Sequence, residues 1–372
     1  EKTDLPKGYE PWWRSRVEGR LSSEGDPVEV TVGSLITGSL EYSSQVRAFS
    51  DLPMIRSQTI GEEKGVFDWR VFAETEYRRT SDPVGNLLTT GGSPRFSESD
   101  WQSFGRFRRK NLHGCEFEIA QEFGLTNNNS NFFIPPNQGT SRLRLSYVQP
   151  LLRGAGVNYN SAQIYLAMLD AAAANDEYSR QLQSHIVEIA RSYWALYVER
   201  ATLLQRVKLT QESEDIYRLL EQRRQLDVDK SQIFRARSAL AQRQSSLARS
   251  VTAVRNAESR VIRLVNDPML EQDVLLELLP TMAPEVDWLD VDMAESKLSA
   301  LQNRPEIAQA KKQISAAAKR QQIACNELQP YLNAVVETYV AGLNGDNDIG
   351  GSFADQFSEG EPGYAVGLIY EY

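Results

Sequence analysis

Side-chain catalysis needs nucleophiles, acids and bases close together, and this sequence offers few. Its 372 residues include only two histidines, two cysteines and no CxxC or HExxH spacing, so a metal site or a histidine-based centre has little to build on. Glu116 and Glu118 are the most suggestive carboxylates, because alternate residues of a strand share a face. Any hydrated strand face carries such residues, and no catalytic partners accompany these two. We predict a protein that is not an enzyme and has no metal site and no cofactor.

The two cysteines, Cys115 and Cys325, lie far apart and in different kinds of segment. An oxidising compartment would permit a disulfide between them, but two unrelated thiols are the simpler interpretation. The net charge of -9 argues against nucleic acid as a partner, because phosphate backbones favour clustered Lys and Arg.

Several segments alternate between apolar and charged residues with a period of two, which is typical of strands. In residues 65–79, Trp69, Val71 and Tyr77 fall on one face, whereas Arg70 and Glu74 fall on the other. Residues 115–125, 142–147, 332–340 and 364–372 alternate in the same way, and a polar stretch rich in Gly, Pro and Ser occupies 81–100. The charged face has two explanations. It is the solvated face of a soluble β-sandwich, or it lines a water-filled lumen while the apolar face meets lipid. The residues expected on this charged face are Arg70, Glu74, Arg142, Arg144 and Glu337.

A very long helical hairpin is predicted between the strand over 142–147 and the strand over 332–340. Proline and glycine are both absent from Val157 to Asp267, and a helix over 160–226 would be ~100 Å long. An apolar seam on this helix has 3–4 spacing, and the returning helix has a strict seven-residue ladder, which together indicate an antiparallel coiled coil. The seam is Ile189, Tyr193, Leu196, Leu203, Val207 and Tyr217, a second apolar flank is Trp194, Tyr197, Ala201 and Leu204, and the ladder is Ile233, Leu240, Leu247, Val254 and Val261.

The turn between the two long helices is short and polar, and Asp229 is a good N-cap for the returning helix. Two further helices are expected, over 32–64 with a kink or break at Pro53, and over 291–329 with Pro305 in a first helical turn. Each of these helices leads into a strand, a long loop and a second strand. This helix–strand–loop–strand unit therefore occurs twice, as an internal repeat.

The chain resembles the TolC-like outer-membrane efflux proteins over roughly residues 30–372. The matching motifs are Gln149-Pro150-Leu151-Leu152-Arg153-Gly154, Ala190-Arg191-Ser192-Tyr193-Trp194-Ala195-Leu196, Arg235-Ala236, Arg304-Pro305-Glu306-Ile307 and Glu327-Leu328-Gln329-Pro330-Tyr331-Leu332. The resemblance implies an α+β membrane protein with transmembrane β-barrel strands, a long antiparallel coiled-coil hairpin and an internal repeat. It also implies a homotrimer in which each protomer gives four strands to one outer-membrane barrel and its helices to a periplasmic tunnel.

Function follows from the resemblance as an expectation. Such a trimer is a passive exit duct of a tripartite efflux or type I secretion system, in contact with outer-membrane lipid, a periplasmic adaptor and an inner-membrane pump. The adaptor is expected at the hairpin tip, which comprises Arg223, Arg224, Leu226, Asp227, Val228 and Asp229. The alternative is a soluble or surface-attached structural protein with a coiled-coil arm and a β-sandwich head.

The organisation along the chain can also be predicted. The expected segments are an irregular N-terminal segment (1–28), a first-repeat periplasmic helix (29–64), first-repeat barrel strands with a long extracellular loop (65–154), the hairpin (155–268), a linker or equatorial element (269–290), a second-repeat helix (291–329) and second-repeat strands (330–372). The extra strand over 115–125 is expected to be part of an extracellular elaboration. The family continues into a second helical hairpin after the last strand. We therefore expect a natural chain longer by at least ~100 residues, partly because the second apolar flank would otherwise be an exposed stripe.

Overall fold

The structure, a computed structural model, describes residues 10–21, 26–224, 229–271, 276–284 and 291–372. The chain forms two compact units that interleave along the sequence. The first unit comprises Glu1–Pro53 and Ala174–Gln309, and the second comprises Met54–Ala173 and Ala310–Tyr372. Within the described part of the chain, no helix is both long and apolar enough to cross a membrane.

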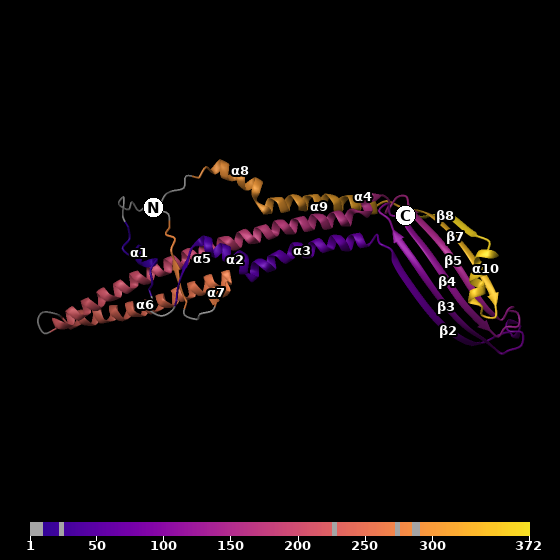
Figure 1. Ribbon diagram of the computed structural model, residues 1–372, viewed down its shortest axis with the longest axis horizontal. Coiled ribbons are helices and arrows are strands. Elements are labelled where there is room, and N and C mark those ends of the chain that lie inside the picture. Colours follow the sequence, from indigo (N-terminus) through magenta and orange to yellow (C-terminus); the bar gives the residue numbers. More distant parts are fainter. Residues whose placement is uncertain (1–9, 22–25, 225–228, 272–275, 285–290) are drawn as a thin grey trace. The chain divides into compact units, whose positions relative to one another are not determined.

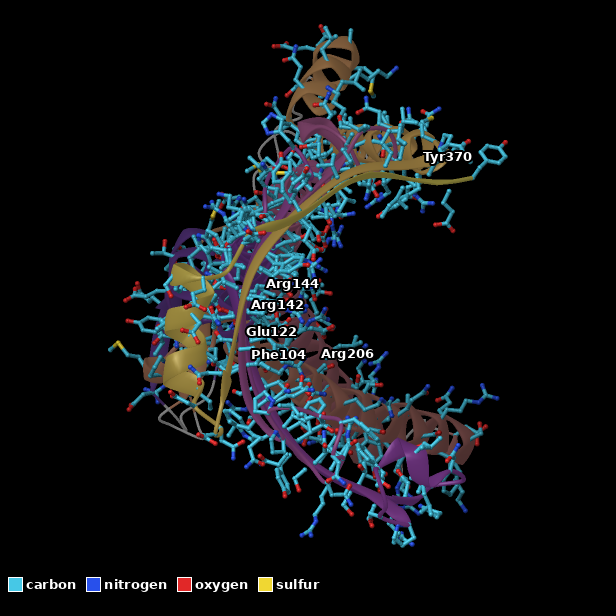
Figure 2. All side chains as sticks on the ribbon, turned by 90° about the vertical axis from the view of Figure 1, so that its right-hand side faces the viewer. Phe104, Glu122, Arg142, Arg144, Arg206 and Tyr370 are labelled. Carbon is cyan, nitrogen blue, oxygen red and sulfur yellow. The ribbon has the colours of Figure 1, made fainter. Side chains whose placement is uncertain are left out.

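The second unit is built on one six-stranded antiparallel sheet in the order β2-β3-β4-β5-β7-β8 (Figure 1). Figure 2 shows that this sheet is strongly curved, with a concave and a convex face. All six strands belong to this one sheet, so the β-sandwich head of the alternative interpretation is wrong. The strands are β2 (Arg70–Pro83), β3 (Arg95–Lys110), β4 (Glu116–Asn128), β5 (Asn137–Pro150), β7 (Tyr331–Gly345) and β8 (Gly363–Glu371).

Strand β3 was missing from the sequence prediction, which placed a polar stretch and an extracellular elaboration there. Its alternation is blurred because Phe104 lies on the charged face beside Arg106, while Trp101 and Phe107 lie on the apolar face. Both β3 and β4 are full members of the sheet and pair over nearly their whole length. In the described residues this sheet therefore has six strands, whereas the resemblance implied four.

A second unpredicted element is helix α10 (Ile349–Ser358), which follows β7 and packs on the convex face of the sheet (Figure 2). Two glycines near its start argue against a helix in the sequence, but Asp348 caps it by accepting a hydrogen bond from the Gly351 N–H at 2.8 Å. Its buried Gln356 accepts a hydrogen bond from the Ser141 hydroxyl at 2.6 Å. The backbone of α10 lies so close to Gly342 that any side chain there would collide with it.

Several helices contribute to the second unit beside the sheet. They are the last part of α3 (Ser44–Gly65), α4 (Val157–Asn160), the start of α5 (Ala162–Gln222) and most of α9 (Pro305–Glu327). The strand-to-helix junction after β5 is fixed by hydrogen bonds. The Asn160 side chain donates to the Gly154 and Gly156 carbonyls, and the Gly154 N–H donates to Asn326 Oδ1 at 2.8 Å. Positive φ angles at Gly154 and Gly156 explain the glycines of this motif.

The first unit is dominated by the predicted hairpin of α5 and α6 (Lys230–Val265), with Asp229 as the N-cap of α6. The expected seam residues Ile189, Tyr193 and Leu196 are buried in one cluster with Val254 and Val261. Leu240 and Ile233 are also buried, whereas Leu247 of the same ladder is only half-buried. The other elements of this unit are α1 (Arg14–Val17), β1 (Pro27–Val30), α2 (Val32–Tyr42), α7 (Pro268–Glu271), β6 (Glu277–Pro280), which pairs parallel with β1, and α8 (Met293–Asn303).

Of the kink or break expected at Pro53, the break does not occur there. Helix α3 continues through Pro53, and the chain leaves the helical conformation at Ser43, where ψ is 122°. The later helix is also divided, because α8 ends at Asn303 and α9 starts with the predicted helical Pro305.

The second apolar flank of α5 is covered by the N-terminal segment of the chain. Val17 is fully buried against Tyr197, Ala201 and Leu204, with Trp13 packed beside them. The flank therefore needs no further hairpin to cover it, which removes that argument for a longer chain. Both cysteines are free, Cys115 buried and Cys325 exposed.

Candidate functional site

The five residues predicted for the charged face all lie on one face of the sheet, which Figure 2 shows to be the concave one. One row of directly paired residues across the strands runs from Arg70 through Glu118 to Glu337. Other rows contain Arg144 and, together, Glu74 and Arg142. Alternation along each strand gives every one of these side chains the same orientation.

Arginines and glutamates are interspersed on this face and form a loose lattice of ion pairs. Glu118 lies 3.6 Å from both Arg106 and Arg144, and Arg144 lies 3.6 Å from Glu122 as well. These side chains retain 20–43% of their exposure, so each pair is hydrated and weak. The face is therefore polar and wet, with neither sign of charge concentrated on it.

Aromatic rings lie between the arginines. The Arg142 guanidinium stands 4.9 Å from the centre of the Tyr339 ring, and Arg106 stands 5.3 Å from that of Phe104. Phe72 packs beside Phe104 with 5.7 Å between ring centres. Cation–π contacts of this kind hold long arginine side chains against the wall of the sheet.

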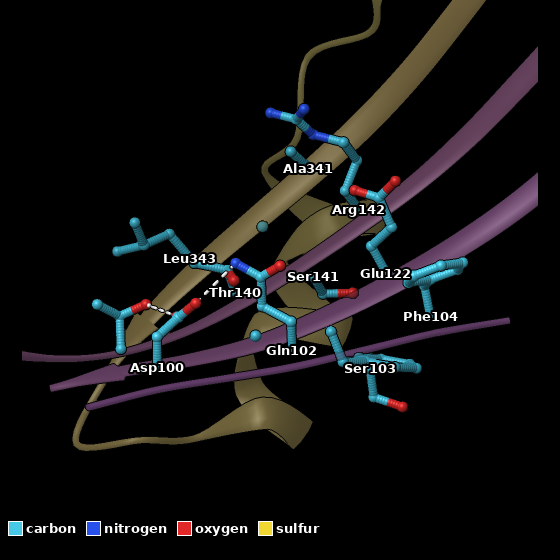
Figure 3. A pocket seen from close by; sticks show the side chains of 14 residues that line it. Asp100, Gln102, Ser103, Phe104, Glu122, Thr140, Ser141, Arg142, Ala341 and Leu343 are labelled. Atoms are coloured by element: carbon cyan, nitrogen blue, oxygen red, sulfur yellow. Dashed lines mark hydrogen bonds between the residues drawn. The ribbon is translucent and has the colours of Figure 1, made fainter. Parts of the chain in front are cut away.

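Residues of β3, β4, β5 and β7 line a hollow of about 560 Å³, and Figure 3 shows its lining side chains. Three of its polar side chains bond to one another, since Asp100 accepts hydrogen bonds from Thr126 at 2.9 Å and from Gln102 at 2.7 Å. In the described residues, no cluster of His, Cys, Asp or Glu is arranged to hold a metal ion. The hollow is therefore a polar recess in the concave face of the sheet.

The hairpin tip is the second predicted site. Arg223 and Arg224 are exposed at the end of α5, where Arg224 pairs with Glu221 at 3.2 Å. Asp229 accepts hydrogen bonds from the backbone and hydroxyl of Ser231, which hold its pKa below the usual range. Leu226, Asp227 and Val228 lie outside the described residues.

Sequence reasoning missed a buried cation in the first unit, because an arginine on a long helix is normally read as solvated. Arg200 is fully buried and donates hydrogen bonds to the carbonyls of Val17, Gly19 and Leu278, and to the Glu277 carboxylate at 3.0 Å. It thereby ties the N-terminal segment to α5 and β6. In the sequence, the buried position of Arg200 is indicated only by the neighbouring second apolar flank of α5, which the hairpin alone does not cover.

A second carboxylate completes this buried cluster. Glu258 accepts a hydrogen bond from the Leu278 N–H at 3.3 Å and lies 4.0 Å from Arg200. Burial raises the pKa of Glu258 and lowers the pKa of Arg200, since both charges have lost water. Such a cluster is costly to break, because removing one partner leaves a buried charge without compensation.

Comparison with known proteins concerns the fold. Scans of protein-family models and of curated proteins find no match. Solved structures do match: the outer-membrane channel OprN (14% identity, TM-score 0.57, covering 92% of this chain and 64% of that one), VceC from Vibrio cholerae (14%, 0.54, 91% and 67%) and MtrE from Neisseria gonorrhoeae in its open state (14%, 0.55, 92% and 63%). This chain has the TolC-like outer-membrane channel fold. It spans about two thirds of the length of these channels.

The TolC-like fold accounts for the resemblance motifs in structural terms. The motif at residues 149–154 is the junction where β5 turns into α4, and Pro330 stands between α9 and β7. The internal repeat is also present, since α3 leads into β2 and α9 leads into β7. The additional hairpin β3–β4 lies within the first repeat only. The roles of the concave face and of the tip remain predictions.

Proposed function

We propose that this chain is one protomer of a homotrimeric exit duct in the outer membrane, with its helices extending into the periplasm. The duct is passive and serves a tripartite efflux or type I secretion system. It acts with a periplasmic adaptor and an inner-membrane pump, without nucleic acid and without enzymatic chemistry.

The observation that carries this proposal is the separation of side chains between the two faces of the curved sheet. The concave face holds the hydrated lattice of arginines and glutamates, which suits a water-filled lumen. Beyond the part that α10 covers, the convex face is mainly apolar, with Arg79 and Arg109 near the ends of β2 and β3, which suits contact with lipid. Its residues include Val71, Tyr77, Phe107, Ile119, Leu145, Tyr147, Val336 and Val366.

The proposed adaptor contact rests on the geometry of the hairpin. The turn between α5 and α6 joins two long antiparallel helices and presents exposed arginines. A partner that covers this turn would pair its carboxylates with Arg223 and Arg224.

The experiment reverses the charge at the tip. In cells lacking this protein, the double variant Arg223→Glu/Arg224→Glu should restore efflux at least ~10-fold less well than the unmodified chain, the effect of losing about 1.4 kcal/mol of adaptor binding. The amount of trimer in the outer membrane should be unchanged. The matched control is Lys297→Glu/Lys311→Glu, which reverses two exposed charges outside the hairpin.

Efflux that survives the tip variant would make this region a solvated turn without a partner. Failure of the unmodified chain to support efflux, with normal amounts of trimer present, would overturn the proposed duct itself.

A further inference from the structure

Among the described residues, no strand pairs with the outer side of β2 or of β8, the two edge strands of the sheet. Both are long, with 14 and 9 residues, and neither is blocked by a bulge or by a proline before the last residue of β2. They are also far more exposed than the inner strands, with Val71 at 66%, Leu368 at 70% and Tyr364 at 82%. Natural proteins usually protect open edges of this length, because unpaired backbone groups invite another chain.

In a membrane such edges must be closed. Each backbone N–H or C=O without a partner costs several kcal/mol in hydrocarbon, so only closed sheets span a bilayer. We propose that β8 of one copy pairs with β2 of the next in the register that places Glu371 opposite Arg70, so that three copies close an eighteen-stranded wall. This inference rests on the proposed function. It adds the number of strands in the barrel, the pair of strands that joins neighbouring copies, and the register of that pair.

The directions of the two edge strands permit β8 of one copy to pair with β2 of the next. All pairs within the sheet are antiparallel, and the number of strands is even. β2 and β8 therefore run in opposite directions. Joining copies edge to edge continues the antiparallel order without a break, whereas an odd number of strands would force a parallel pair at each seam.

Barrel geometry restricts the register. The row that starts at Arg70 ends at Ala365 on β8. With Glu371 opposite Arg70, Ala365 comes to lie opposite Glu76, six residues along β2 from Arg70. A shift of six residues over six strands gives a tilt of about 35°, at ~3.4 Å per residue and ~4.8 Å between strands. Barrel strands tilt by roughly 35–45°.

Other registers fit less well. A shift of four residues gives a tilt of about 25°, which is too small, and a shift of eight gives about 43°, which is acceptable. Odd shifts are excluded because they would turn the charged face of one copy toward the lipid side of the next. The tilt and the orientation of the side chains thus leave a shift of six or of eight residues.

Side chains decide between these two. At a shift of six, Glu371 faces Arg70 on the concave side, and Ile369 faces Phe72. At a shift of eight, Glu371 would face Phe72 and Ile369 would face Glu74. Opposite charges and apolar pairs across strands are favourable, each by roughly 0.2–1 kcal/mol. The convex pairs are mostly apolar or mixed with Thr in both registers, so the concave pairs decide; at a shift of six the convex pairs are Tyr370–Val71, Leu368–Ala73, Val366–Thr75 and Tyr364–Tyr77.

The wall that results is wide. Barrel diameter grows roughly linearly with strand number, so eighteen strands give a duct about 1.5-fold wider than four strands from each of three copies would. Barrels of this size leave an open aqueous channel. The insertion of β3–β4 therefore widens the exit for larger solutes.

Disulfide trapping tests the register. In a background with Cys115→Ala and Cys325→Ser, the pair Leu368→Cys/Ala73→Cys should oxidise to a covalent trimer on a denaturing gel. Leu368→Cys/Thr75→Cys, which tests a shift of eight, should give at least ~10-fold less, because a disulfide joins Cα atoms only ~4.4–6.8 Å apart. Trapping by the second pair alone would overturn the register.

A charge exchange is the second measurement. Arg70→Glu alone should lower the yield of trimer, and Arg70→Glu/Glu371→Arg should restore it; lack of restoration would contradict the proposed pair. Electron microscopy of the purified trimer then counts strands directly. Eighteen is expected, whereas twelve with β3–β4 outside the wall would overturn the proposal and leave the proposed duct standing. Absence of a trimer from the outer membrane would instead overturn the proposed function.

Discussion

At the scale of single residues, the buried His185 of the first unit links folding to pH. It is buried on α5, its Nε2 lies 2.7 Å from the Ser39 hydroxyl oxygen, and its ring packs edge-on against Phe49. Burial lowers the pKa of His185 below the usual 6.5, and nearby Glu188 opposes this only in part. The unfolded chain therefore binds a proton at this site more readily than the folded one, so stability falls as pH drops below about 6.5.

The prediction is that His185→Gln flattens this dependence. Glutamine keeps a hydrogen-bonding group near Ser39 but has no charge to gain. Thermal unfolding between pH 7.5 and 5.5 should show a smaller fall in midpoint for His185→Gln than for the unmodified protein. His113→Gln is the matched control, since His113 is exposed. Equal slopes for the unmodified protein and His185→Gln would show that another group causes the dependence.

At the scale of elements, the hairpin could be predicted because two independent signals agreed. The absence of Pro and Gly predicted the length of the hairpin, and the heptad ladder predicted that its two helices pack against each other. Strand β3 could not be predicted, because Phe104 and Arg106 share a face and break the alternation. Helix α10 was hidden by Gly350 and Gly351, and is stabilised by tertiary contacts such as that of Gln356 with Ser141.

Some features of the candidate site could likewise be predicted from the sequence, and others could not. Period-two alternation was enough to place Arg142 and Glu337 on the charged face. The position of Glu118 between Arg106 and Arg144 depends on the pairing of β3 with β4 and of β4 with β5. Such contacts link residues far apart in sequence, and alternation within one strand says nothing about them.

The ladder gives the prediction at this scale. Leu240 is buried and Leu247 is half-buried, although both occupy equivalent heptad positions. Leu240→Ala should lower the free energy of opening of the hairpin by about 2–5 kcal/mol, and Leu247→Ala by roughly half as much. Amide hydrogen exchange of α5 and α6 measures this opening locally. A larger effect at Leu247 than at Leu240 would contradict the burial seen here.

At the scale of the whole molecule, the proposed duct requires the sheet to separate lipid from water. Leu145 and Ser146 are neighbours on β5 that point to opposite faces, and both are half-buried. Leu145 lies on the convex face, on the row formed with Ile119 and Thr338. Ser146 lies on the concave face, directly between Glu118 and Glu337.

The last prediction compares an arginine at each of these positions. Leu145→Arg should reduce the trimer in the outer membrane strongly, because arginine on a lipid-facing strand costs about 2–4 kcal/mol near the bilayer midplane. Ser146→Arg should assemble normally, since its guanidinium would stand in water between two carboxylates. Heat-resistant trimer from outer-membrane fractions is the measurement, and total expression is the control. Equal tolerance of both arginines would mean that water bathes both faces, and the sheet would then not be the wall of a membrane duct.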